Sequence, residues 1–205
     1  LGMKNADVDL DNTFLTTFNT LNNLSDVVNK KTKIIFASSS AIYGEINKKI
    51  SEETESLGAR SNYGAMKLAS ESYISFFSHK YNVSSFIFRF PNVVGQNLTH
   101  GVIYDLYKKL RTRSKYLNIL GNGHQRKPYS HANEIIDCMI YVIDKKFKKK
   151  INIFNIGTDD KGIKVNEIVK ILLNKFKSNK IPRYEKNSRG WPGDIPKYQY
   201  STTKI

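Results

Sequence analysis

Tyr63 and Lys67 are a pair of residues whose types and spacing could do chemistry. Residues four apart lie on the same face of a helix, so a phenol and an ammonium group would be neighbours if this segment is helical. A nearby cation favours the phenolate over the phenol, whose ordinary pKa is about 10. We therefore expect Lys67 to lower the pKa of Tyr63 and so to prepare its hydroxyl for general acid/base work.

A serine cluster upstream could act on the same substrate oxygen. Residues 33–37 form a short apolar run typical of a buried strand, and it leads directly into Ser38, Ser39 and Ser40. Active sites of open parallel sheets gather at the C-terminal ends of the strands. We expect Ser40 to work with Tyr63, while Ser38 and Ser39 either contact a cofactor or only end the strand by bonding its backbone.

Helical and strand patterns alternate along the chain. The apolar spacing predicts helices over 13–29, 62–80, 101–114, 132–146 and 165–176, and strands over 33–37, 85–90, 116–120 and 151–156. Ser61 or Asn62 can cap the second helix. The tail from Pro182 to Pro196 is rich in proline and glycine and predicts a loop. Strands that alternate with helices of this length favour an α/β protein with a parallel sheet.

The composition is typical of a globular protein. The 205 residues are 40% hydrophobic, 12% aromatic and 25% charged, which excludes a disordered chain and allows a substantial core. No apolar run approaches the ~20 residues of a membrane span, and no signal segment opens the chain. The single Cys138 cannot form an internal disulfide, and the four histidines lack metal-ligand spacing. We expect a soluble, cytoplasmic protein with no membrane partner and no metal.

The formal net charge is +15, from 33 Lys and Arg against 18 Asp and Glu. A basic surface can serve nucleic acid. Most of the excess here is lysine scattered among many Asn and Ile residues, which is more typical of solvated faces. We therefore do not expect nucleic acid to be the main partner.

Six short blocks follow one another in a recognisable order. They are Ser-Ser-Ser-Ala-Ile-Tyr-Gly at 38–44, Tyr-Gly-Ala-Met-Lys at 63–67, Arg-Phe-Pro-Asn-Val-Val-Gly at 89–95, Gly-Asn-Gly-His-Gln-Arg-Lys-Pro-Tyr-Ser-His at 121–131, Phe-Asn-Ile-Gly at 154–157 and Gly-Trp-Pro-Gly-Asp at 190–194. Over nearly the whole chain, this order resembles the extended short-chain dehydrogenase/reductase family, and within it the nucleotide-sugar epimerases of the UDP-glucose 4-epimerase type. The resemblance implies a Rossmann-type parallel sheet with a smaller C-terminal α/β substrate-binding lobe, NAD as cofactor, a UDP-sugar substrate and a homodimer.

The resemblance also implies roles for individual residues, matched by position. The implied catalytic residues are Ser40, Tyr63 and Lys67. The implied cofactor-binding residues are Ser38, Tyr63, Lys67, Phe90 and Pro91. The implied substrate-binding residues are Ser40, Asn92, Lys127, Arg189 and Asp194. Lys127 stands where relatives often have an arginine, which keeps the charge but loses the bidentate fork that suits a diphosphate.

The residues after Ser40 bear on the reaction. Sugar 4,6-dehydratases of this family have an Asp-Glu pair there, and decarboxylating relatives have a Glu, whereas Ala41 and Ile42 cannot move protons. The resemblance then implies epimerisation at C4, in which Tyr63 takes the hydroxyl proton as hydride leaves for NAD and hydride returns to the other face of the keto sugar. Another NAD(P)-dependent nucleotide-sugar epimerase or a reductase is the alternative within the family.

The sequence contains no Gly-x-x-Gly-x-x-Gly turn of the kind that receives the NAD pyrophosphate. By the resemblance, we interpret residues 1–95 as part of an NAD-binding domain, and residues 96–205 as mainly the substrate-binding lobe, interleaved with the sheet. On this interpretation the chain is a fragment. If the 205 residues were the entire gene product, we would expect an inactive protein that binds a nucleotide-sugar or RNA without catalysis.

Overall fold

A computed structural model of the chain describes residues 6–46, 48–55 and 57–205. Its main sheet has three parallel strands in the order β1-β2-β7, which are Lys33–Ser39, Ser84–Phe90 and Ile151–Asn155. β1 and β2 pair in register from Lys33 with Ser84 to Ser39 with Phe90. Because the strands are parallel, their C-terminal ends meet at one edge of the sheet, and the predicted α/β fold is confirmed.

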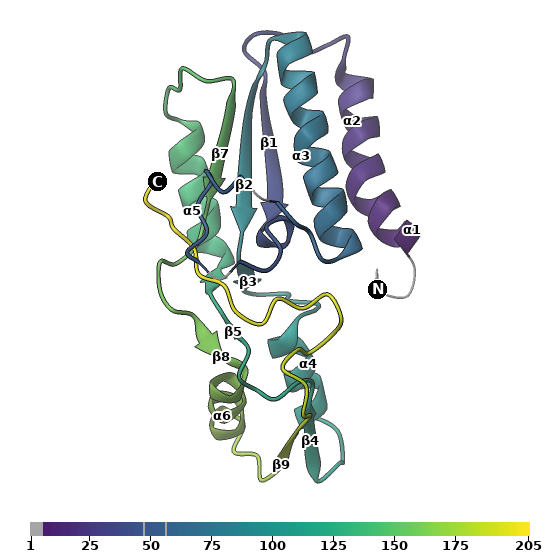
Figure 1. The fold of residues 1–205 in the computed structure, drawn as a ribbon, viewed down its shortest axis with the longest axis vertical. Helices are drawn as coiled ribbons and strands as arrows, with labels where there is room; N and C mark the ends of the chain where they lie inside the picture. The colour runs from purple at the N-terminus through teal and green to yellow at the C-terminus, as the bar shows by residue number, and fades with distance from the viewer. Residues whose placement is uncertain (1–5, 47, 56) are drawn as a thin grey trace.

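Helices cover both faces of this sheet (Figure 1). Successive side chains of a strand point to opposite faces, and β2 shows this directly. Its Ile87 packs in a cluster with residues of α3 (Asn62–Tyr81), whereas Phe86 and Phe88 pack with residues of α5 (Ala132–Ile143). A second helical layer contacts α3, formed by α1 (Ala6–Asp9), the π-helical turn η1 (Leu10–Leu15) and α2 (Thr16–Leu24).

A smaller lobe lies beyond the C-terminal ends of the strands (Figure 1). Its helices are α4 (Val102–Leu110) and α6 (Val165–Lys175), and its parallel strands are β4 (Tyr116–Ile119) and β9 (Ile181–Tyr184). Two short pairs join it to the sheet, β3 (Asn92–Val94) with β6 (Tyr129–His131) and β5 (Arg126–Lys127) with β8 (Ile163–Lys164). Since β7 follows the lobe's α4 and β4 in sequence but belongs to the main sheet, the two parts are interleaved.

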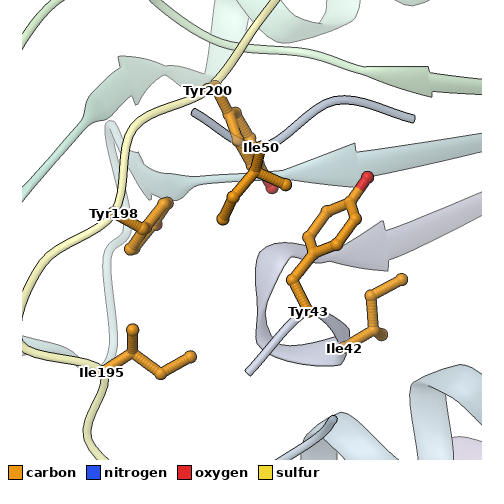
Figure 2. Close-up of a cluster of buried hydrophobic side chains, with 6 residues drawn as sticks. All are labelled: Ile42, Tyr43, Ile50, Ile195, Tyr198 and Tyr200. Atoms are coloured by element: carbon orange, nitrogen blue, oxygen red, sulfur yellow. The ribbon is translucent and has the colours of Figure 1, made fainter. Parts of the chain in front are cut away.

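The tail of the chain packs across the C-terminal edge of the sheet (Figure 2). There it forms one buried cluster with the segment after β1, made of Ile42, Tyr43, Ile50, Ile195, Tyr198 and Tyr200. Tyr200 is fully buried, and its hydroxyl donates to the carbonyl oxygen of Phe90 at 3.2 Å. A residue near the end of the chain is thereby fixed beside the end of β2.

Two predicted elements differ from the structure. The helix expected over 13–29 begins earlier and ends at Leu24, and the residues that follow it, Ser25, Asp26, Val27 and Val28, all have a low helix propensity. The tail expected to be a loop contains part of β9, which is held by its pairing with β4. No helix of the described residues is long and apolar enough to cross a membrane.

Candidate active site

The end of β1 and the start of α3 bring together the two residues whose spacing suggested chemistry. The Lys67 ammonium donates to the carbonyl oxygen of Ala37 at 2.8 Å. The side chain of Ser39 lies close enough to the Tyr63 hydroxyl to lower its pKa. As a whole residue, Tyr63 is 40% exposed. Strand and helix therefore hold a tyrosine, a lysine and a serine at one place.

Gly64 allows α3 to approach the turn that follows β1. A Cβ atom at this position would lie 2.6 Å from the carbonyl oxygen of Ala41, far inside contact distance. The helix starts here because Ser61 caps it, accepting a hydrogen bond from the Gly64 backbone N–H at 3.1 Å. The expected cap is thus present, and it starts the helix at Asn62, one residue before Tyr63.

The pKa of Tyr63 moves in the opposite direction to the one expected from its neighbour. Burial raises the pKa, the side chain of Ser39 opposes that rise, and the charge of Asp9 adds to it. The Lys67 ammonium lies 5.7 Å from the centre of the tyrosine ring. The pKa of Lys67 is itself lowered by burial, while the charge of Glu71 opposes this change. Burial therefore has a larger effect on the pKa of Tyr63 than the charge of Lys67, on which the expectation from the sequence relied.

The three serines point to three different partners. Ser39 accepts a hydrogen bond from the Ala41 backbone N–H at 3.2 Å and lowers the pKa of Tyr63, whereas Ser40 donates to the hydroxyl of Tyr198 at 3.2 Å. Ser38 is only 2% exposed, and its hydroxyl donates to the carboxylate of Glu71. Its hydroxyl thus faces the interface between the sheet and α3.

Asn92 lies close to Ser40, because the side chains of both residues donate a hydrogen bond to the hydroxyl of Tyr198. The Asn92 amide donates to the Tyr198 hydroxyl at 3.3 Å and to the carbonyl oxygen of Pro128 at 3.3 Å. Tyr198 is 6% exposed. Sequence reasoning missed Tyr198, whose only signal was its place four residues after Asp194 in the tail.

Phe90 and Pro91 continue β2 at the same edge of the sheet. Phe90 is the register partner of Ser39, so it lies directly beside the strand end that carries the serines. Pro91 is buried against Gly157, where an added Cβ would lie 2.9 Å from the proline Cγ. Both residues are therefore held at the predicted edge.

The residues expected to bind a diphosphate form a second cluster. Asp194 is 3% exposed and accepts hydrogen bonds from the Lys127 ammonium and from the Gly190 backbone N–H. Arg189 donates to the carbonyl oxygen of Asp194 at 2.7 Å and to the carboxylate of Glu45 at 2.6 Å. Both cations thus face carboxylates, and a bound anion would have to share or displace these contacts. In the described part of the chain, no group of three or more His, Cys, Asp or Glu could hold a metal ion.

Comparison with known proteins gives this arrangement a family. The profile of the NAD dependent epimerase/dehydratase family matches residues 2–157. A protein of Methanocaldococcus jannaschii described as a putative UDP-glucose 4-epimerase is 29% identical over 163 residues, which are 77% of this chain and 52% of that relative. The chain belongs to this NAD-dependent family, and it spans about half the length of the curated relative that it matches.

Solved structures agree with the fold. A UDP-galactose 4-epimerase superimposes with a TM-score of 0.84 at 28% identity, covering 97% of this chain and 63% of that one. A UDP-glucose 4-epimerase of Thermotoga maritima, solved with UDP-glucose, gives a TM-score of 0.82 at 26% identity, covering 99% of this chain and 64% of that one. The chain therefore has the Rossmann-like fold of the extended short-chain dehydrogenase/reductases.

Proposed function

We propose that this protein carries out the NAD-dependent epimerisation of a nucleotide-sugar at C4, of the UDP-glucose/UDP-galactose type. The observation that carries the proposal is the meeting of Ser39, Tyr63 and Lys67 at the end of β1. The residues from Ser40 to Ile42 include no carboxylate that could serve a dehydratase. The solved relatives described as 4-epimerases support the same reaction.

The residues present fit the nicotinamide and ribose end of NAD, which supplies an acceptor and donor of hydride when it is bound. Among the described residues, the carbonyl of Ala37 takes one of the three donors of the Lys67 ammonium, and we assign the others to ribose hydroxyls. Phe90 and Pro91 would flank the nicotinamide. We omit Ser38 from the cofactor residues because its hydroxyl is buried against Glu71.

Tyr63 would act as the acid and base at the sugar. As the phenolate, it would take the proton of the C4 hydroxyl during oxidation, and the resulting phenol would return a proton during reduction. Burial makes the phenolate costly, so the Lys67 ammonium would be needed to stabilise it. We assign the serine in contact with Tyr63 to Ser39, and we place Ser40 with Asn92 beside the sugar, next to Tyr198.

The cluster of Lys127, Arg189 and Asp194 would hold the diphosphate end of the substrate. Its two cations would contact the diphosphate, which would take the place of Glu45 beside Arg189. Because Arg189 contacts both Glu45 and the tail, an anion that takes the place of Glu45 keeps the guanidinium paired. Asp194 would orient Lys127 rather than touch the anion itself, since like charges repel.

A homodimer through α2 and α3 is part of the proposal. A chain of ring contacts joins Phe14 of η1, Phe18 of α2, and Tyr73 and Phe76 of α3. Phe76 is 54% exposed at the end of this row, and Val27 nearby in sequence to α2 is 67% exposed. Apolar side chains exposed on adjacent helices suit a second copy of the same face.

The cytoplasmic location expected from the sequence stays a prediction.

The test is an assay of the protein with NAD and UDP-glucose, with UDP-N-acetylglucosamine in parallel. We expect the 4-epimer to form with no net change at the NADH absorption band. A stoichiometric change at that band without an epimer would replace the proposal with a reductase. Binding of NAD and of the nucleotide-sugar without any product would instead make the protein a non-catalytic binder.

A further inference from the structure

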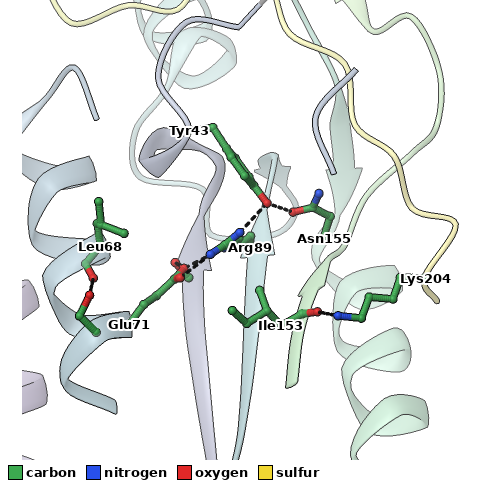
Figure 3. Close-up of polar contacts among 9 residues, drawn as sticks. Tyr43, Leu68, Glu71, Arg89, Ile153, Asn155 and Lys204 are labelled. Atoms are coloured by element: carbon green, nitrogen blue, oxygen red, sulfur yellow. Dashed lines mark hydrogen bonds and ion pairs between the residues drawn. The ribbon is translucent and has the colours of Figure 1, made fainter. Parts of the chain in front are cut away.

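A buried ion pair lies one helical turn beyond Lys67. The side chains of Glu71 and Arg89 are only 5% and 4% exposed (Figure 3). The guanidinium donates from Nη2 to Oε2 at 2.7 Å and from Nε to Oε1 at 3.1 Å. A two-point, charge-assisted contact of this kind fixes the carboxylate and the guanidinium relative to each other.

The pair is fixed from several elements of the fold (Figure 3). Arg89 of β2 donates from Nη1 to the hydroxyl of Tyr43 at 2.7 Å, and that hydroxyl donates to the side-chain carbonyl of Asn155 in β7 at 2.7 Å. Ser38 of β1 donates to Glu71 from the other side. All five residues are buried, so the carboxylate cannot move away to solvent.

Glu71 is placed to act on the catalytic helix. Tyr63, Lys67 and Glu71 follow one another at intervals of four residues on α3, so they lie along one face. Ala37 accepts from Lys67 and the next residue, Ser38, donates to Glu71, which ties the two helix residues to consecutive strand residues. The negative charge of Glu71 opposes the fall in the pKa of Lys67 that burial causes.

We propose that Glu71, held in place by Arg89, is a positioning residue that keeps Lys67 charged and aligned with Tyr63. This inference rests on the proposed function, because Lys67 matters only if Tyr63 must ionise. Other groups face the same site. Asp9 of α1 acts on Tyr63, and Tyr43 meets the network only through Arg89.

Removing the charge of Glu71 should shift the pKa of Lys67 in a definite direction. An ammonium that loses a nearby anion has a lower pKa, so the pKa of Lys67 falls. For a group one helical turn away, we expect a shift of roughly one pH unit. The limb of the pH-activity profile that depends on the charge of Lys67 should then move to lower pH. A purely structural pair would lower activity equally at every pH.

The experiment titrates Lys67 by NMR in protein carrying ¹³C-labelled lysine side chains, with the signal assigned by Lys67→Arg. Glu71→Gln is compared with wild type and with Glu53→Gln, which removes the same charge from an exposed loop position. Glu71→Gln leaves Arg89 unpaired, so the double variant Glu71→Gln/Arg89→Met, which removes both charges, serves if the single variant does not fold.

We expect the titration midpoint of Lys67 to fall in the folded Glu71 variant and to stay unchanged in Glu53→Gln. An unchanged midpoint in a folded Glu71 variant would overturn the inference. The pH-activity profile is measured in parallel. A shifted Lys67 midpoint in a protein with no epimerase activity would refute the proposed function and leave the charge coupling standing, so the two failures can be told apart.

Discussion

At the end of β1, a difference of one residue along the chain decides which serine lies beside Tyr63. Ser39 still has extended backbone angles, with φ −144° and ψ 150°, and so continues the strand. Ser40 already begins the short 3₁₀ turn η2 (Ser40–Ile42), which directs its hydroxyl to Tyr198. Three consecutive serines give no sequence signal for the point at which a strand becomes a turn.

Substitution of each serine tests this assignment. We expect Ser39→Ala to lower kcat by about tenfold to a hundredfold, because it removes a polar group beside a hydroxyl that becomes charged. Ser40→Ala should act mainly on KM through the sugar. Steady-state epimerisation rates measure both, with Ser72→Ala as the control because Ser72 is exposed on α3 and bonds its own helix. A larger loss of kcat in Ser40→Ala would reverse the assignment.

The catalytic pair could be predicted from the sequence because its spacing is local. Tyr63 and Lys67 are neighbours in any helix, whatever packs around it. The partnership of Glu71 with Arg89 joins residues eighteen apart and depends on how α3 lies on the sheet. The direction in which the pKa of Tyr63 shifts depends on burial, and burial also depends on how α3 lies on the sheet. This direction too could not be predicted from spacing.

At the scale of elements, the contact between α3 and the turn after β1 sets the geometry of the site. α3 and the flanking strands could be predicted because their apolar patterns and the Ser61 cap are strong and local. β9 could not, since Ile181–Tyr184 is a strand only because β4 lies beside it. The close approach at Gly64 is likewise invisible until the turn is placed against the helix.

Gly64→Ala tests this contact. The new methyl group would meet the carbonyl oxygen of Ala41, and we expect the free energy of unfolding to fall by about 1–3 kcal/mol, with a loss of kcat as Tyr63 moves from Ser39. Urea denaturation measures the first effect. Gly58→Ala is the matched control, because a Cβ there has no neighbour within 4 Å. Equal stability of the two variants would contradict the proposed packing.

At the scale of the whole molecule, the interleaving of sheet and lobe explains why distant segments share one site. The tail residue Tyr198 contacts Ser40 of η2 and Asn92 of β3, although 158 and 106 residues separate them. Such contacts between distant segments follow from the topology, so they could be anticipated only through the family resemblance. Aromatic side chains are exposed on α3, where the proposed dimer would form, and this is a second feature at the scale of the whole molecule.

The proposed dimer can be tested on that face. We expect Phe76→Glu to shift the protein from dimer to monomer in analytical ultracentrifugation, because it would bury a charge at the contact. Ile171→Glu is the control, since Ile171 is equally exposed, at 55%, but lies on α6 in the smaller lobe. A wild-type protein that sediments as a monomer would contradict the proposed dimer.

The most direct test of the central claim is the rate at which Tyr63→Phe interconverts UDP-glucose and UDP-galactose in the presence of NAD. Tyr141→Phe removes a hydroxyl from a tyrosine that is 57% exposed on α5, and it provides the matched control. We predict that Tyr63→Phe remains folded and loses activity by at least about a hundredfold, while Tyr141→Phe retains wild-type activity. Full activity in Tyr63→Phe would contradict the assignment of Tyr63 as the acid and base.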